Sequence, residues 1–290
     1  MNCKVCSSQR TFKEFDAFNR HGRYTLDSSD VFEILRCGDC GAVFVSNIKI
    51  DTDYYKKYYE NDYYTQSFVP CFLKVPLVFL TKLYFNSVER LLLKYKKNKG
   101  VFPFRLLDFG CGKGEFLEHI DSSRFEKYGI EINKAGYEAC IRKGIKVYNQ
   151  DVGALSFLNG YFDIVTLWHV VEHIEDPVRI LTGMHRILKP GGILVLATPN
   201  SRSLGFRWGK NLWFHLDTPR HLVIYDKNNI NLLLKKAGFE FVAQENTFYD
   251  YPLDLFWSLK NSCWKWIVYP LYPFFKLFSN EILVLVFRKC

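Results

Sequence analysis

The sequence predicts an α/β fold with a doubly wound sheet of seven strands, preceded by a small cysteine-rich module. A strand-like apolar segment runs into three closely spaced glycines at 105–114. Apolar segments then alternate with helical patterns, which is the order of a mostly parallel sheet covered by helices. Two Cys-x-x-Cys pairs lie within the first fifty residues. A chain of 290 residues has room for one full α/β domain and a smaller module.

The segment 105–114 reads as a buried strand that turns sharply into a helix. Asp108 ends the strand, and the helix is expected to begin near Glu115. The glycines between them, which allow a tight turn and a close approach of a ligand to the main chain, are Gly110, Gly112 and Gly114. A nicotinamide site would need its third glycine at position 115, where glutamate stands. The loop therefore predicts a nucleotide-like cofactor other than NAD.

Two acids follow the next two predicted strands. The strand 128–131 ends in Glu131, a carboxylate that suits ribose hydroxyls at about the offset found in dinucleotide folds. The strand 145–148 leads to Asp151, which can accept a hydrogen bond from an adenine amino group while the amide of Val152 donates to the ring. Both positions favour a cofactor with an adenosine part.

The remaining strands complete the sheet. A fourth strand at 162–168 is followed by His-Val-Val-Glu-His, and a Leu-Lys-Pro-Gly-Gly turn precedes a fifth strand at 193–197. Residues 239–247 are expected to pair with a terminal strand at 282–287. With these segments, residues 104–247 resemble the class I S-adenosylmethionine (SAM)-dependent methyltransferases, which implies a Rossmann-like, seven-stranded, doubly wound sheet.

The resemblance also implies where the cofactor SAM binds. The loop of Asp108, Gly110 and Gly112 would hold the methionine half of SAM, Glu131 the ribose and Asp151 the adenine. Trp168 is expected to form a wall of the pocket. The full set of expected cofactor-binding residues is Asp108, Gly110, Cys111, Gly112, Gly114, Glu131, Ile132, Asp151, Val152 and Trp168.

Four of the nine cysteines have the spacing of metal ligands. Cys3 and Cys6 form the first Cys-x-x-Cys pair, and Cys37 and Cys40 form the second. Four thiolates suit a closed tetrahedral site, so residues 1–50 are predicted to form a ribbon around a structural Zn²⁺ ion. The alternatives are two redox dithiols or an iron–sulfur site. The expected strands of the ribbon are Val31–Leu35 and Ala42–Val45.

Residues 51–100 are expected to connect the ribbon to a methyltransferase domain at 101–290. The segment 53–64 contains six tyrosines. Such segments cap the SAM pocket in similar ribbon-containing proteins, which include methyltransferases of bacterial surface-glycan pathways and deoxysugar C-methyltransferases. The alternative is a helix that packs its tyrosines on the core. Residues 68–97 predict a helix or two, broken at its prolines.

Methyl transfer to a hydroxyl requires an aligned acceptor, exclusion of water and removal of a proton. Candidate residues lie at 213–225, after the fifth strand, at the sheet edge where such folds bind substrates. His221 is the first candidate for the general base, because neutral imidazole is available near pH 7. The alternative is that His221 only holds a loop in place. His215 is a weaker candidate for the base. His169 can face the methyl group, and the Glu-His pair that follows it is expected to order its loop.

About thirty residues, 251–279, separate the last two strands and mix aromatic residues with lysine. No run in them is long and apolar enough to span a membrane, but they fit an interfacial segment on an anionic membrane, and the net charge of +9 agrees. The alternatives are a substrate lid or a dimer face. The absence of a secretory leader and the cysteine usage predict a cytoplasmic protein, with a peripheral contact at the inner face of the membrane.

Two functional classes fit these patterns. The first is a methyltransferase for a small molecule, a sugar, a nucleotide-sugar or a lipid-linked glycan. The second is a zinc-ribbon-containing RNA methyltransferase, which is disfavoured because the basic residues are scattered and no Asn-Pro-Pro-Tyr motif follows the fourth strand. A SAM-binding scaffold without activity is a third interpretation. The acceptor atom and the oligomeric state stay open.

Overall fold

The computed structural model describes residues 2–21, 24–59, 71–96, 102–150, 157–246, 258–259, 266, 270–271, 274 and 280–290, with only the backbone described at 71–79.

The larger of two sheets has the strand order β10-β11-β8-β7-β4-β5-β6. The five strands from β8 to β6 are parallel, and β11 runs antiparallel to both of its neighbours. The strands are β4 Phe104–Phe109, β5 Phe125–Ile130, β6 Lys146–Tyr148, β7 Phe162–Trp168, β8 Leu188–Pro199, β10 Phe239–Glu245 and β11 Ile282–Lys289. The predicted seven-stranded, doubly wound fold is confirmed, as is the pairing of the last two strands.

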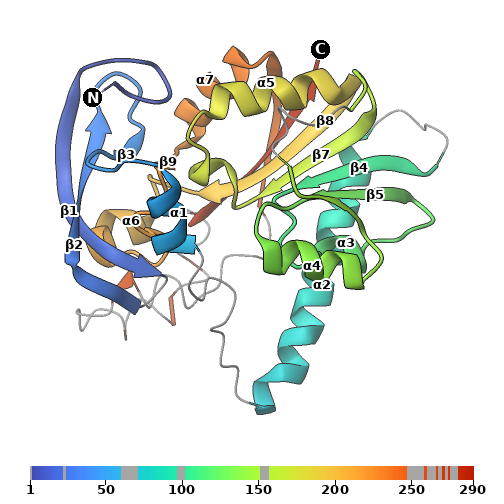
Figure 1. Ribbon diagram of the computed structural model, residues 1–290, viewed down its shortest axis with the longest axis horizontal. Helices are drawn as coiled ribbons and strands as arrows, with labels where there is room; N and C mark the ends of the chain where they lie inside the picture. The colour runs from blue at the N-terminus through green and yellow to red at the C-terminus, as the bar shows by residue number, and fades with distance from the viewer. Residues whose placement is uncertain are drawn as a thin grey trace.

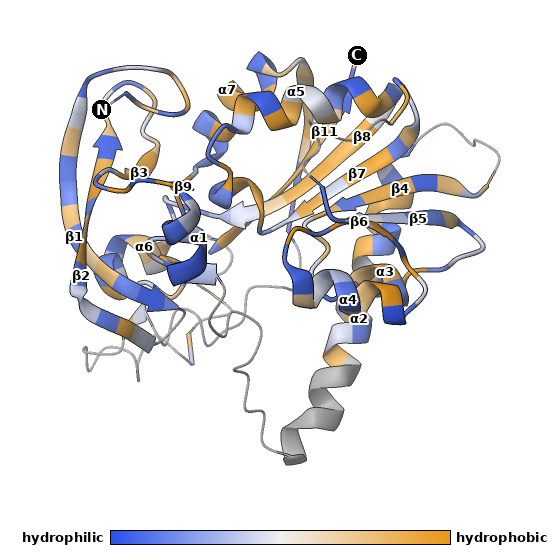
Figure 2. Cartoon of the chain, in the orientation of Figure 1, coloured by the Kyte–Doolittle hydropathy of each residue, from blue (hydrophilic) through white to orange (hydrophobic). Residues whose placement is uncertain are grey.

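Helices cover both faces of this sheet. Figure 1 shows α5 and α7 on one face and α2, α3 and α4 on the other. Because both faces are covered, the central strands are rich in apolar residues, as the orange segments of β7 and β8 in Figure 2 show. All of β7 except Trp168 is buried. The helices are α2 Cys71–Tyr95, α3 Glu115–His119, α4 Lys134–Arg142, α5 Pro177–Ile187 and α7 Lys227–Lys236.

The amino-terminal residues form a second sheet, which is antiparallel and has the order β1-β2-β3-β9. Its strands are β1 Thr11–His21, β2 Tyr24–Cys37, β3 Val43–Val45 and β9 Val223–Ile224. The predicted strand 42–45 corresponds to β3, whereas the predicted strand 31–35 is only part of the longer β2. Sequence analysis missed β1 because many of its side chains are polar and exposed, which weakens the apolar alternation.

The two sheets share a core. Strand β9 belongs to the later part of the chain, and its Val223 pairs with Phe44 of β3. Trp213 and Phe206, from the loop after β8 that contains α6 Leu204–Gly209 and η2 Lys210–Leu212, pack in one cluster with Ile34. The packing therefore crosses the domain boundary predicted at residue 50, and the predicted division into domains stays an interpretation.

The connector begins with the helix α1 Thr52–Tyr59. Tyr54 is buried, and its ring contacts the rings of Tyr55, Tyr58 and Tyr59. This arrangement agrees with tyrosines that pack on the core; residues 60–70, which include the last two tyrosines of the segment, lie outside the described residues.

The predicted break at Pro76 is wrong, because α2 runs continuously from Cys71 to Tyr95. One proline removes one backbone hydrogen bond near the start of the helix, and the remaining turns are sufficient to continue it.

Most of 251–279 also lies outside the described residues, so the predicted membrane segment, lid or dimer face there stays a prediction. Within the part of the chain that the structure describes, no helix is long and apolar enough to cross a membrane.

Candidate functional site

A pocket of about 320 Å³ opens at the carboxyl ends of β4 and β7. The chain continues from β4 toward β5 on one side and returns to β7 on the other, so this is the point where the strand order reverses. Ligands of doubly wound sheets bind at such a switch point. The described residues that line the pocket are Tyr84, Phe85, Asp108, Gly110, Cys111, Gly112, Lys113, Glu115, Phe116, Trp168 and His169.

The glycine loop has a backbone that other residues would strain. Gly110, Gly112 and Gly114 have φ values of 74°, 55° and 72°, in the left-handed region that favours glycine. A Cβ at Gly110 would also lie 2.6 Å from a methyl group of Val170. The amides of Gly110 and Cys111 donate to the carbonyl of Ile130, so the loop is held against the end of β5 and leaves its outer face open to a ligand.

Asp108 is a buried acid at the floor of the pocket. Its carboxylate accepts a hydrogen bond from Oγ1 of Thr166 at 2.7 Å. Burial raises the pKa of Asp108 to about 7, although the Thr166 hydrogen bond lowers it. A cationic ligand such as SAM would stabilise the charged form of this carboxylate.

Glu131 directly follows β5 and is buried. Its Oε2 accepts from the amide of Gly112 at 2.8 Å, and its Oε1 accepts from the amide of Asn133 at 2.7 Å. Glu131, which was predicted to bind the ribose, therefore also holds the glycine loop in place. Ile132, which was predicted to line the site, is largely exposed. Asp151 and Val152, predicted for the adenine, lie outside the described residues.

His169 follows β7 and lines the pocket together with Trp168. It has a φ of 56°, a left-handed conformation that is uncommon for histidine and costs about 1–3 kcal/mol. Its Nδ1 lies 3.4 Å from Oε1 of the fully buried Glu172. Nε1 of Trp168 is buried without a hydrogen-bond partner among the described residues, so a donor is available to a ligand. His169 thus lines the pocket with a left-handed backbone and with its ring against the buried carboxylate of Glu172.

His221 lies on the other side of Glu172. Its Nε2 is 3.9 Å from Oε1 of Glu172, and its Nδ1 donates to the carbonyl of His215 at 2.8 Å. Burial lowers the pKa of His221 to about 4. His221 is not among the described residues that line the pocket, so the structure brings both predicted histidines to one carboxylate but only His169 to the pocket.

Glu172 and His173, the pair that was expected to order the loop after β7, contact residues from other parts of the chain. Glu172 and His173 lie in the 3-10 helix η1 Val171–His173, and Glu172 accepts a hydrogen bond from Thr198 at 3.0 Å. His173 contacts the hydroxyl of Tyr59 and the carbonyl of Arg220.

Sequence analysis missed three contributors to the site. Tyr84 and Phe85 come from α2, which was expected to serve only as a connector, and Thr166 lies inside a buried strand that was interpreted only as part of the sheet. The aromatic pair in the connector was the signal that could have indicated the first two.

The four predicted zinc ligands come together in the amino-terminal module. Sγ of Cys3 lies 3.6 Å from Sγ of Cys40, Sγ of Cys6 lies 3.5 Å from Sγ of Cys37, and all four sulfurs lie within 4.8 Å of one another. These separations are too long for disulfides. They are close to the ~3.8 Å between thiolates that a tetrahedral site with ~2.3 Å Zn–S bonds requires.

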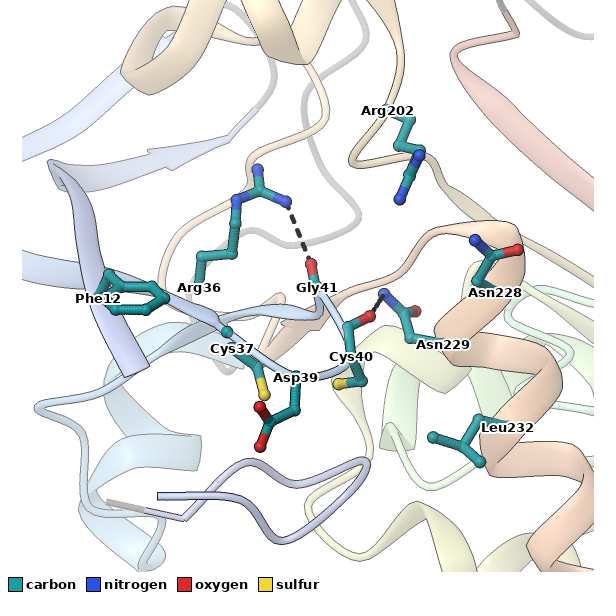
Figure 3. Close-up of a pocket in the computed structure, with 11 residues that line it drawn as sticks. Phe12, Arg36, Cys37, Asp39, Cys40, Gly41, Arg202, Asn228, Asn229 and Leu232 are labelled. Atoms are coloured by element: carbon teal, nitrogen blue, oxygen red, sulfur yellow. Dashed lines mark hydrogen bonds between the residues drawn. The ribbon is translucent and has the colours of Figure 1, made fainter. Parts of the chain in front are cut away.

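The second Cys-x-x-Cys loop is anchored on both sides, as Figure 3 shows. Arg36 donates to the carbonyl of Gly41 at 3.1 Å, and Asn229 of α7 donates to the carbonyl of Cys40 at 3.5 Å. Lys236 of α7 donates to the carbonyl of Val5 in the first loop. A second pocket, of about 620 Å³, lies between this loop and α7. The cysteine cluster is therefore built against the larger domain.

A glycine loop at the switch point, followed by a buried acid after the next strand, defines a class I SAM-dependent methyltransferase. The family model described as a methyltransferase domain matches residues 78–244, and the chain belongs to this family. It is an enzyme that uses SAM.

Curated relatives agree with this assignment. The ubiquinone biosynthesis O-methyltransferase of Cereibacter sphaeroides is 31% identical over 178 residues, which cover 53% of this chain and 67% of the relative.

Solved structures share the fold at lower identity. A chain of the Haloferax volcanii complex between the Trm112 methyltransferase activator and a methyltransferase has a TM-score of 0.52 and 15% identity, and the match covers 72% of this chain and 93% of that chain. The cyclase SpnF has a TM-score of 0.50 and 20% identity, and the match covers 70% of this chain and 80% of that chain. These likenesses concern the fold alone.

Proposed function

We propose that this methyltransferase transfers the methyl group of SAM to a hydroxyl oxygen of a small-molecule acceptor. The observation that carries the proposal is His169, a polar side chain in a strained conformation that lines the cofactor pocket and is backed by a buried carboxylate. The acceptor class is supported by the curated relatives, which are named O-methyltransferases of ubiquinone biosynthesis.

In this proposal different residues bind the cofactor, line the pocket and remove the proton. The loop of Gly110 and Gly112, together with Asp108 and Glu131, binds SAM, which supplies an electrophilic methyl group. Tyr84 and Phe85 of α2 line the pocket and provide an apolar wall for the reacting groups. His169 holds the acceptor hydroxyl and takes its proton, because a positioned base accelerates such a transfer by about 10²–10⁴-fold. Glu172 orients the imidazole ring of His169 through the contact between Oε1 of Glu172 and Nδ1 of His169.

The histidine assignment is tested by separating binding from turnover. His169→Ala should retain the affinity for S-adenosylhomocysteine, measured by calorimetry, while methyl transfer falls by about 10²-fold or more. His215→Ala is the matched control, because the ring of this partly buried histidine contacts the Trp213 and Phe214 rings and His215 is not among the described pocket residues. Equal turnover in His169→Ala and the wild type would contradict the assignment.

The acceptor class is tested with SAM that carries a tritium-labelled methyl group. The full chain is incubated separately with a low-molecular-mass metabolite pool, a lipid extract and RNA from one bacterial lysate. We expect label in the metabolite pool. Label in the lipid extract would favour the lipid-linked glycan predicted from the sequence, and label confined to RNA would contradict the small-molecule acceptor.

The four-cysteine cluster is proposed to bind one structural Zn²⁺ ion. The sulfur separations and the closed ligand set support this role. Burial raises the pKa values of the Cys3 and Cys40 thiols, whereas at Cys37 hydrogen bonds from the amides of Cys40 and Asp39 and from the Cys6 and Cys40 thiols outweigh burial and lower the pKa to about 7. A bound metal ion would favour the thiolate form of all four. Metal analysis should detect zinc that is released when Cys37 is replaced by Ser; zinc-free protein with a protease-resistant amino-terminus would contradict the proposal.

The sugar or glycan acceptor, the cytoplasmic location and the membrane contact through 251–279 remain proposals that rest on the sequence. Replacement of Trp257, Trp264 and Trp266 by Ser should reduce co-sedimentation with anionic liposomes. A wild-type protein that ignores such liposomes at low salt would argue against the membrane contact.

A further inference from the structure

Glu172, His173 and His221 form a buried cluster behind His169. Each offers one oxygen or ring nitrogen, and the three atoms lie within 4.8 Å of one another. The first two residues belong to η1, directly after β7, and His221 stands just before β9, so the cluster lies where both sheets meet. It is distinct from the four-cysteine cluster, and the proposed methyl transfer uses only the contact between Glu172 and His169.

Backbone carbonyls select the same tautomer in both histidines. Nδ1 of His173 lies 3.0 Å from the carbonyl oxygen of Arg220 and 3.2 Å from the Tyr59 hydroxyl, which can also accept from it, and Nδ1 of His221 lies 2.8 Å from the carbonyl oxygen of His215. A carbonyl oxygen only accepts, so each Nδ1 carries a proton, and each neutral ring keeps a lone pair on Nε2. Metal-binding histidines commonly donate their other N–H to a backbone carbonyl in this way.

Glu172 supplies the oxygen of the cluster. Its Oε2 accepts from Thr198, whereas its Oε1 is fully buried and forms no well-aligned hydrogen bond among the described residues; Nδ1 of His169 lies 3.4 Å from it. Nε2 of His221 lies 3.9 Å from this oxygen, which is too far for a hydrogen bond. Nε2 of His221 and Oε1 of Glu172 therefore face each other as two buried acceptors, and a cation between them offsets the cost of burying both.

The charged groups near the three residues pair with Asp217 rather than with Glu172. Asp217 Oδ2 also lies 3.9 Å from Nε2 of His221, but Arg220 pairs with the same carboxylate at 2.7 Å. His169 Nδ1 lies 3.4 Å from Oε1 of Glu172 and completes the surroundings on the pocket side. Asp217 is therefore paired with a guanidinium, whereas the ion-pair contacts of Glu172 among the described residues are those with the rings of His169 and His221.

We propose that Glu172, His173 and His221 bind a divalent transition-metal ion of the Zn²⁺ class. Two imidazoles and a carboxylate are a common donor set for such ions, and three protein ligands leave a coordination position open. The ion neutralises Glu172. If the proposed function holds, it also places a positive charge next to the histidine that faces the acceptor.

The test titrates Zn²⁺ and Co²⁺ into metal-depleted, reduced full-length protein without SAM or acceptor. We expect a Co²⁺ site that shows ligand-field bands without the intense thiolate charge-transfer band and that persists in Cys37→Ser. Glu172→Gln and His221→Gln should each weaken this site by about 100-fold or more, since even outer partners of a metal contribute 10–100-fold. His119→Gln is the matched control, because this histidine on α3 makes an exposed contact with Asn86.

Wild-type protein in which Co²⁺ gives only the thiolate spectrum would overturn the proposal, whether or not the substituted proteins fold. A second site that survives in both folded glutamine variants would overturn it as well. Since no methyl transfer is measured, failure of the metal site and failure of the proposed function remain distinguishable.

Discussion

Glu131→Ala removes the carboxylate that follows β5 and has two separable consequences. Both oxygens of Glu131 hold backbone amides, those of Gly112 and Asn133. An amide left without an acceptor costs about 1–3 kcal/mol when fully buried; because Gly112 and Asn133 are only partly buried, the free energy of unfolding should fall by about 2 kcal/mol, the lower end for two such groups. Loss of two charge-assisted bonds to the ribose should weaken SAM by about 2–4 kcal/mol, or roughly 30- to 700-fold in Kd.

Urea denaturation measures the first effect and calorimetry with SAM the second. Glu138→Ala is the control, because this glutamate on α4 makes only a 4.0 Å contact with Lys134 and is half exposed; both quantities should stay at wild-type values. If Glu131→Ala binds SAM like the wild type, Glu131 does not belong to the cofactor site. Unchanged stability would refute the role assigned to its hydrogen bonds.

Three further predictions concern Asp108, Cys37 and Arg220. Burial raises the pKa of Asp108 to about 7, so its carboxylate lowers the stability of the free protein as pH rises from about 4 to 7. SAM favours that carboxylate, and its calorimetric affinity should fall by up to about tenfold per pH unit below 7; an Asp108→Asn variant with the same pH profile would contradict this. Cys37 belongs to the main core cluster, so Cys37→Ser should lower the thermal midpoint of the whole chain, whereas Cys290→Ser at an exposed site should not; equal midpoints would show that the module unfolds independently. Arg220→Ala removes the guanidinium that pairs with the buried carboxylate of Asp217 and leaves it the contact with the His21 ring at 2.8 Å. Urea denaturation should show a loss of about 3–5 kcal/mol; a loss below about 1 kcal/mol would refute the importance of the Arg220–Asp217 pair.

The cofactor loop could be predicted from the sequence because its properties are local. Glycines at alternate positions after an apolar strand specify a tight turn, and the structure places Asp108, Gly110 and Gly112 in the pocket. The two cysteine pairs were equally informative, since ligand spacing survives even where the strands around it are mispredicted.

The destinations of other side chains depend on tertiary contacts that a local pattern does not contain. His221 and His169 are both near the carboxyl edge of the sheet in sequence terms, but η1 brings Glu172 between them and leaves His169 at the pocket. The pairing of β3 with β9 joins residues about 180 positions apart, so a local sequence pattern does not predict this pairing. For the same reason Tyr84 and Phe85 could not be assigned to the pocket from the connector alone.

The most direct test of the central claim is a crystal structure of the complex with S-adenosylhomocysteine. We expect the methionine half to lie along the glycine loop at Asp108, the ribose to contact Glu131, and the sulfur to face His169. A ligand bound in the pocket beside α7, or a sulfur that faces away from His169, would contradict it.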